Sequence, residues 1–123
     1  KKVPAGSVIQ TLIGFENDNA NSFNVEYVRG FLTSPQDSTY FAQNFSGQLY
    51  NTTVDTGVEA SLLYEFRPDP NIDPREWGLI VEVFYADADN VTYLQTAYNS
   101  TISVTDPESN FDAKSLFAFL AIA

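Results

Sequence analysis

Four asparagines stand in Asn-x-Ser/Thr tripeptides, the acceptor pattern for N-linked glycans. They are Asn44, Asn51, Asn90 and Asn99, and none of the four tripeptides has proline in the middle. One tripeptide is common by chance, whereas four in 123 residues favour a glycosylated chain that faces the endoplasmic reticulum lumen or the cell exterior. Coincidence of composition is the alternative. Asn90 falls in a predicted turn, while Asn51 and Asn99 fall in predicted strands and require outward-facing positions.

Two acidic turns offer oxygen ligands for a weak calcium site. The turn from Asp87 to Asn90 lacks the glycine and the distal glutamate of an EF-hand, and the segment Asp69–Asp73 is stiffened by proline. Calcium takes six to eight oxygen ligands from a loop of suitable shape. Ordinary turns therefore explain both segments better, and we expect no cofactor, with weak calcium binding as the alternative.

The composition excludes most catalytic chemistry. The chain has no His and no Cys, which removes Ser-His-Asp triads, His-ligated zinc, thiolate nucleophiles and disulfides. Paired carboxylates could hydrolyse glycosides, but 123 residues provide little material for a deep cleft. Six Lys and Arg against 16 Asp and Glu give a net charge of −10, which repels nucleic-acid phosphates. We expect neither an enzyme nor a nucleic-acid-binding protein.

Arg67, Arg75 and Trp77 are the predicted partner-binding residues, because they flank the longest predicted loop. Exposed loops at the end of a β-domain commonly carry binding function. The alternative for the two arginines is a solvated surface charge. Trp77 could offer a stacking platform for a sugar, but its alternation with Leu79 and Val81 favours a position in the core.

Apolar residues alternate with polar ones along most of the chain, which is the pattern of half-buried strands. The clearest runs are Val58–Arg67 and Trp77–Ala86, and the composition of the second suits a central strand. Turn-forming residues separate the runs. The fold class is therefore all-β, an antiparallel immunoglobulin-like or fibronectin-like β-sandwich of about seven strands. The weaker runs are Ser7–Glu16, Asn24–Thr33, Ser38–Phe45, Gly47–Val54 and Val91–Val104, the last with a bend or bulge expected near Ala97.

The end of the chain has a different pattern, since every residue from Leu116 to Ala123 is apolar. We expect residues 1–105 to form the sandwich, residues 106–114 a juxtamembrane linker, and residues 115–123 the start of a C-terminal transmembrane helix. Eight residues are too few to cross a bilayer, which requires about 20. A last strand or a short packed helix is the alternative.

The segment Ser34-Pro35-Gln36-Asp37, followed by Tyr40-Phe41-Ala42-Gln43-Asn44-Phe45-Ser46, resembles the alpha subunits of the translocon-associated protein complex (signal sequence receptor alpha). The resemblance covers roughly residues 8–104. The loop Asp69–Glu76 departs from the family's pattern, where a glycine-containing loop is expected. Further segments in the expected order are Leu12-Ile13-Gly14-Phe15-Glu16-Asn17, Tyr64-Glu65-Phe66-Arg67-Pro68, Gly78-Leu79-Ile80-Val81 and Tyr85-Ala86-Asp87.

The resemblance implies a non-catalytic accessory subunit in the endoplasmic reticulum membrane, with this domain in the lumen. Its implied partners are the protein-conducting channel, the other subunits of the complex and, indirectly, the ribosome, with the membrane reached through the C-terminal helix. Its implied role is to assist signal-sequence insertion and protein translocation. Of the four acceptor tripeptides, only the one at Asn44 matches a tripeptide of the family's pattern. The other three are inferred from this sequence alone. The alternative is a glycosylated cell-surface adhesion or carbohydrate-binding β-sandwich module.

Overall fold

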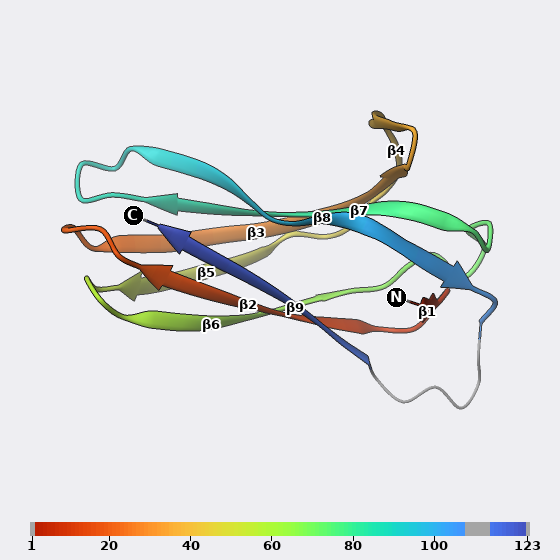
Figure 1. The fold of residues 1–123 in the computed structure, drawn as a ribbon, viewed down its shortest axis with the longest axis horizontal. Coiled ribbons are helices and arrows are strands. Elements are labelled where there is room, and N and C mark those ends of the chain that lie inside the picture. Colours follow the sequence, from red (N-terminus) through yellow and green to blue (C-terminus); the bar gives the residue numbers. More distant parts are fainter. Residues whose placement is uncertain (1, 108–113, 123) are drawn as a thin grey trace.

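The computed structural model describes residues 2–107 and 114–122, which form nine strands and no helix (Figure 1). The strands make a six-stranded sheet, in the order β1-β8-β7-β3-β4 with β5 also on β3, and a three-stranded sheet, in the order β6-β2-β9. The strands are β1 (Lys2–Pro4), β2 (Ile9–Asn17), β3 (Phe23–Ser34), β4 (Asp37–Asn44), β5 (Gln48–Val54), β6 (Glu59–Phe66), β7 (Glu76–Ala86), β8 (Thr92–Thr105) and β9 (Lys114–Ile122).

Strand β7 is central, as its composition predicts, with β8 on one side and β3 on the other. Its odd-numbered side chains from Trp77 to Tyr85 are all buried, which confirms the predicted alternation. On β6, Leu62, Tyr64 and Phe66 are buried in the same way, while Leu63 is exposed. The buried residues of both sheets form one hydrophobic cluster, so the two sheets share a core.

Register shifts interrupt the pairing of the long strands. The predicted irregularity near Ala97 is confirmed, because Val81 pairs with Tyr98 while Glu82 pairs with Thr96, which leaves Ala97 unpaired with β7. A second shift, between Val25 and Tyr27, affects the pairing of β3 with both β5 and β7.

The prediction of a wholly antiparallel sandwich is wrong, because β1 pairs with β8 and β2 pairs with β9 in parallel. Neither pairing can be read from alternation alone. Strand β1 is only three residues long and contains Pro4, which is tolerated at a sheet edge. The remaining strand pairs are antiparallel.

The apolar run at the end of the chain is strand β9, not the start of a helix as predicted for residues 115–123. Leu120 is buried while Phe119 is exposed, so neighbouring side chains point to opposite faces although both are apolar. A short run of uniformly apolar residues does not distinguish a strand from a helix. Residues 108–113 of the predicted linker lie outside the described residues. Within the described part, no helix is long and apolar enough to cross a membrane.

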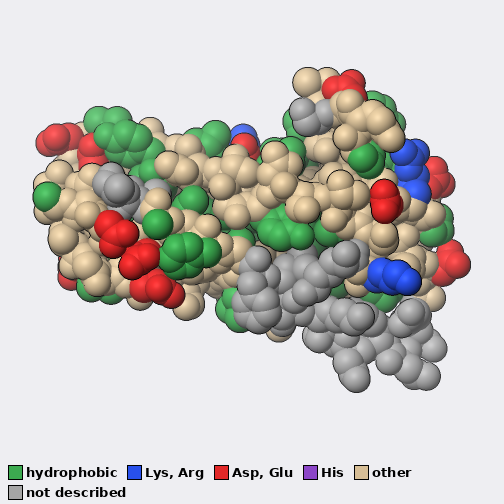
Figure 2. Space-filling view, in the orientation of Figure 1, with side chains coloured by type: hydrophobic (Ala, Val, Ile, Leu, Met, Phe, Trp, Pro, Cys, Tyr) green, Lys and Arg blue, Asp and Glu red, His purple; other side chains and the backbone are tan. Residues whose placement is uncertain are grey.

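The two ends of the domain differ in charge. The turns that join β2 to β3, β5 to β6 and β7 to β8 carry Asp18, Asp55, Asp87 and Asp89 and no Lys or Arg. At the opposite end, the loop between β6 and β7 contains Arg67 and Arg75 together with Asp69 and Asp73. On the face drawn in Figure 2, Lys and Arg side chains lie mostly toward the β1 end, and a cluster of Asp and Glu lies toward the other.

Candidate functional site

The last two residues of β4 and the three residues that join it to β5, residues 43–47, carry the most specific motif of the sequence, and we call this stretch the crossing segment. Strands β4 and β5 both pair with the same edge of β3, where Phe31 faces Asn44 and Val28 faces Gln48. The crossing segment passes the stretch of β3 between these two pairings. There the backbone N–H of Phe45 donates to the carbonyl oxygen of Gly30 at 2.9 Å, which fixes the segment against β3.

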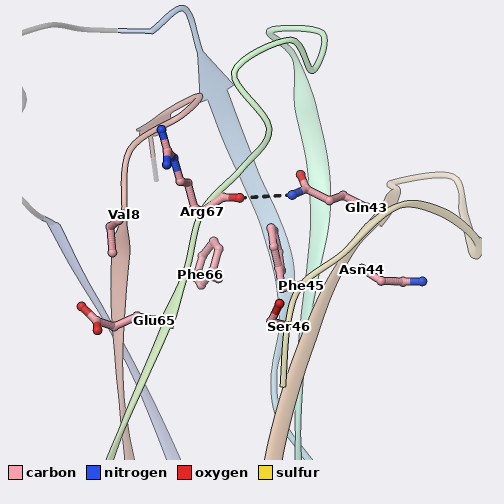
Figure 3. Close-up of a pocket in the computed structure, with 8 residues that line it drawn as sticks. All are labelled: Val8, Gln43, Asn44, Phe45, Ser46, Glu65, Phe66 and Arg67. Carbon is pink, nitrogen blue, oxygen red and sulfur yellow. Dashed lines mark hydrogen bonds between the residues drawn. The ribbon is translucent and has the colours of Figure 1, made fainter. Parts of the chain in front are cut away.

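Gln43 joins the crossing segment to the loop that follows β6. Its Nε2 donates to the Arg67 carbonyl at 3.1 Å (Figure 3). Its Oε1 accepts from the Asp69 N–H at 2.9 Å. Both ends of one amide side chain are therefore used to hold the start of the loop. The Arg67 Nε in turn donates to the Gly6 carbonyl at 2.7 Å. The predicted binding loop is thus tied at its first residues to the turn that follows β1 and to β4.

Phe45 and Tyr64 hold the crossing segment from the core side. Phe45 is buried, with its ring centroid 4.7 Å from that of Phe66. The Tyr64 hydroxyl donates to the Ser46 carbonyl at 3.0 Å, across the gap between the two sheets. Tyr64 is fully buried, and this burial raises the pKa of its phenol to about 12. The hydroxyl therefore stays protonated and able to donate at any physiological pH.

A shallow groove of about 400 Å³ lies between the crossing segment and the end of β6. Figure 3 shows its lining residues, with Val8 and Glu65 on one side and the crossing segment on the other. Its polar side chains are one carboxylate, one guanidinium, two amides and the Ser46 hydroxyl, and the chain has no histidine to act as a base for that hydroxyl. Such a groove suits contact with another molecule better than a reaction.

Arg75 and Trp77 form a second feature at the same end of the domain. The Arg75 guanidinium carbon lies 4.7 Å from the centre of the Trp77 ring, which is cation–π geometry. Trp77 is 7 % exposed, and its Nε1 donates to the Asp73 carbonyl at 3.0 Å. The indole is therefore a core residue that supports Arg75, not an open platform for sugars. The pair lines a pocket of about 360 Å³ with Tyr40 and Asp37 on the facing hairpin.

Arg67 belongs to the groove and Arg75 to this pocket, so the structure places the predicted arginines in two neighbouring sites and not in one. Both are exposed. The hairpin β3–β4 contributes to both sites, through Tyr40 to the pocket and through Gln43 to the groove. A partner that covered this end would contact both arginines.

All four predicted glycan acceptors are exposed. Three of them lie on strands: Asn44 at the end of β4, Asn51 in β5 and Asn99 in β8. Asn90 occupies the β7–β8 turn with a φ of 61°, a left-handed conformation that asparagine tolerates better than most residues. Exposure meets the first requirement for an acceptor, and modification of the four residues stays a prediction.

The acidic turns use their carboxylates within the turn. Asp87 accepts from the backbone N–H groups of Val91 at 3.0 Å and Asp89 at 2.9 Å, and from the Tyr93 hydroxyl at 2.9 Å. The bond from Val91 is the largest cause that holds the Asp87 pKa below its ordinary value, aided by those from Tyr93 and Asp89. In the described part of the chain, no group of three or more acidic side chains is placed to hold a metal ion.

Sequence reasoning missed an aromatic cluster on the outer face of the six-stranded sheet. The Arg29 guanidinium carbon lies 4.9 Å from the centre of the Phe84 ring and 5.8 Å from that of Phe31, and its Nε bonds to Glu82 at 2.8 Å. Tyr27 packs against Phe84 with ring centroids 5.8 Å apart. The alternation of Tyr27, Arg29 and Phe31 along β3 is the signal that could have identified this face.

The chain resembles known proteins along its whole length. A family model described as "Translocon-associated protein (TRAP), alpha subunit" matches residues 1–123. The chain is 39 % identical over 121 residues to a Dictyostelium discoideum protein named "Translocon-associated protein subunit alpha", with 98 % of this chain and 50 % of that protein covered. Proteins of the same name from Rattus norvegicus and Arabidopsis thaliana are 28 % and 27 % identical over 120 and 118 residues, covering 38 % and 45 % of those proteins. The chain thus spans half or less of these relatives' length.

Proposed function

This chain belongs to the family of translocon-associated protein alpha subunits, and from that premise we propose that it is part of a non-catalytic accessory subunit of the endoplasmic reticulum translocon. The match over residues 1–123 is the observation that carries the proposal. In this role the domain lies in the lumen, contacts the protein-conducting channel and the other subunits of the complex, and assists signal-sequence insertion and protein translocation. The ribosome is an indirect partner.

We propose further that the contact is made by the end of the domain that presents Arg67 and Arg75. Both guanidinium groups are exposed, and each is held by a defined contact: Arg67 by the Gly6 carbonyl, Arg75 by the Trp77 ring. A held guanidinium loses less side-chain entropy when it binds an acidic partner. Where a membrane anchor raises the local concentration, a contact of limited area is sufficient.

Co-purification of the full-length protein tests both proposals. Tagged protein from mildly solubilised microsomes should enrich channel and ribosomal proteins. Recovery of extracellular or plasma-membrane partners without the channel would contradict the accessory role and favour the adhesion alternative.

The matched variants locate the contact. Alanine at both Arg67 and Arg75 should reduce recovery of the channel severalfold, whereas Arg29→Ala, which removes one positive charge from the outer sheet face, should not. Because Arg67 bonds to Gly6, the melting temperature is measured in parallel. Equal recovery from the double variant and from wild type would show that this end does not dock.

A further inference from the structure

A row of paired residues crosses the outer face of the six-stranded sheet and has a glycan acceptor at each end. Asn44 of β4 pairs with Phe31 of β3, Phe31 pairs with Ile80 of β7, and Ile80 pairs with Asn99 of β8. Directly paired residues of neighbouring strands present their side chains on the same face. Asn44 and Asn99 are both exposed. Any sugar attached to either residue therefore emerges beside the aromatic cluster of this face.

A pocket of about 360 Å³ adjoins Asn44, and Asn44 itself lines it. Its walls include Tyr27, Phe31 and Phe41, together with Arg29. The rings of Phe31 and Phe41 meet edge to face, with centroids 4.9 Å apart and planes at 83°. Phe41 is 52 % exposed, which is a large open surface for a phenylalanine. This combination of apolar rings with a few polar groups is typical of small-molecule sites.

The pocket wall on the Tyr27 side depends on Gly47. A side chain at residue 47 would overlap the phenol ring of Tyr27, so glycine lets that ring lie against the crossing segment. On the core side, the crossing segment is fixed by Phe45 and by the hydrogen bond from Tyr64. Asn44 is therefore presented to the pocket from a rigid backbone.

We propose that the glycan attached to Asn44 folds back into this pocket, with its first N-acetylglucosamine stacked on the rings of Phe31 and Phe41. This inference rests on the predicted glycosylation of Asn44. The faces of aromatic rings are electron-rich, and one face of a pyranose, like the N-acetyl methyl group, presents C–H groups to them. The Arg29 guanidinium and the backbone beside it offer polar partners to the sugar's hydroxyl and amide groups.

The occupant is this chain's own sugar because the acceptor lines the pocket. A covalently attached group acts at a high effective concentration, in the millimolar range for short flexible connections. A sugar from another glycoprotein would have to compete with it. Folded back in this way, the sugar covers Phe41 and turns away from the groove with Arg67, which Asn44 also lines.

A double-mutant cycle on the full-length glycosylated protein tests the inference. Ser46→Ala removes the acceptor pattern and keeps Asn44 and the Ser46 carbonyl position, while Phe41→Ala removes the exposed ring. Pulse proteolysis in urea, followed by immunoblotting, measures the folding equilibrium constant of wild type, both single variants and the double variant. In the wild-type background, Ser46→Ala should lower the constant roughly threefold to tenfold, the range expected of an aromatic contact. In the Phe41→Ala background it should have almost no effect.

Two controls make the cycle specific. Tyr40→Ala removes a neighbouring ring, 60 % exposed, that does not line this pocket, and it should leave the effect of Ser46→Ala unchanged. Thr101→Ala removes the Asn99 acceptor pattern. It should change the folding equilibrium constant by the same factor in the wild-type and the Phe41→Ala backgrounds. Trimming with endoglycosidase H, which leaves one N-acetylglucosamine, should preserve the stabilisation; its loss would overturn the assignment to the first sugar.

The failures are distinguishable. If Ser46→Ala causes no mobility shift, Asn44 is not glycosylated and the inference falls with its premise. If Asn44 is occupied but Ser46→Ala acts equally in both Phe41 backgrounds, the stacking is overturned while the glycosylation stands. Neither result changes the co-purification test of the translocon role.

Discussion

Replacing Tyr64 with phenylalanine tests how the crossing segment is held. The substitution keeps the buried ring and removes the hydroxyl that donates to Ser46. A typical intramolecular hydrogen bond contributes about 1 kcal/mol net, and leaving a buried carbonyl without a partner adds to that loss. Ser46 is exposed, so water can reach its carbonyl after small shifts. We therefore expect a loss of about 1 kcal/mol, not the larger cost of an orphaned buried group.

The same variant has a signature in alkaline solution. Burial raises the Tyr64 pKa from its ordinary 10 to about 12, so below about pH 10 the phenol is neutral in both the folded and the unfolded chain. Between about pH 10 and pH 12 the unfolded chain ionises first, and stability falls as the pH rises. Two pKa units correspond to at most roughly 3 kcal/mol. Tyr64→Phe should remove this part of the alkaline loss.

Urea denaturation at about pH 8 and pH 11 measures both effects. Tyr50→Phe is the matched control, because burial also raises the pKa of Tyr50 to about 12 while its hydroxyl bonds to the Leu63 carbonyl outside the crossing segment. A Tyr64→Phe midpoint equal to that of wild type at pH 8 would refute the role of the hydrogen bond. An alkaline loss of full amplitude in the variant would refute the assignment of that loss to Tyr64.

Three further predictions concern the turns and the charged end. Gly57→Ala should cost roughly 1 kcal/mol in a denaturation series, because φ is 76° there and the space is open, so only backbone strain acts; a neutral result would contradict this. Asp87→Asn should destabilise the fold at pH 7, and the loss should shrink as the pH is lowered below the ordinary carboxyl value, because the lowered pKa gives stability that is present above the ordinary value and is lost as pH falls through the lowered one; a loss that does not change with pH would be evidence against it. Arg75→Ala should increase acrylamide quenching of Trp77, the only tryptophan, and cost about 0.5–1 kcal/mol; unchanged quenching would argue against the stacking.

The strands could be predicted because most of them bury only one face. Strand β7 was predicted from residue 77 to 86 and runs Glu76–Ala86, since buried and partly buried positions alternate from Trp77 to Tyr85. A last strand was only the alternative for the apolar run that became β9, because residues from Leu116 on are apolar on both faces and do not alternate in polarity. Pairing partners depend on contacts between distant residues, which no local pattern contains.

The acceptor asparagines could be predicted from a tripeptide, whereas their surroundings could not. That Asn44 and Asn99 lie at the two ends of one row follows from three strand registers. The two arginines were predicted to act together because one loop separates them in sequence. In the structure Arg67 lines a groove and Arg75 lines a separate pocket. Gln43 binds the backbone at the start of the loop, and Trp77 packs against Arg75 at its end.

The crossing segment shows how one short stretch can present a modification site and also connect the two sheets. Successive side chains of an extended backbone point to opposite faces. Asn44 is exposed while Phe45 is buried against Phe66, and the next carbonyl accepts from Tyr64 of the other sheet. The inward anchors restrict the backbone from which Asn44 projects, so the position of any attached sugar is determined by the packing of the core. A loss of the Tyr64 hydrogen bond should therefore loosen the sugar's contact with Phe41 as well as lower stability, which joins the first prediction to the glycan cycle.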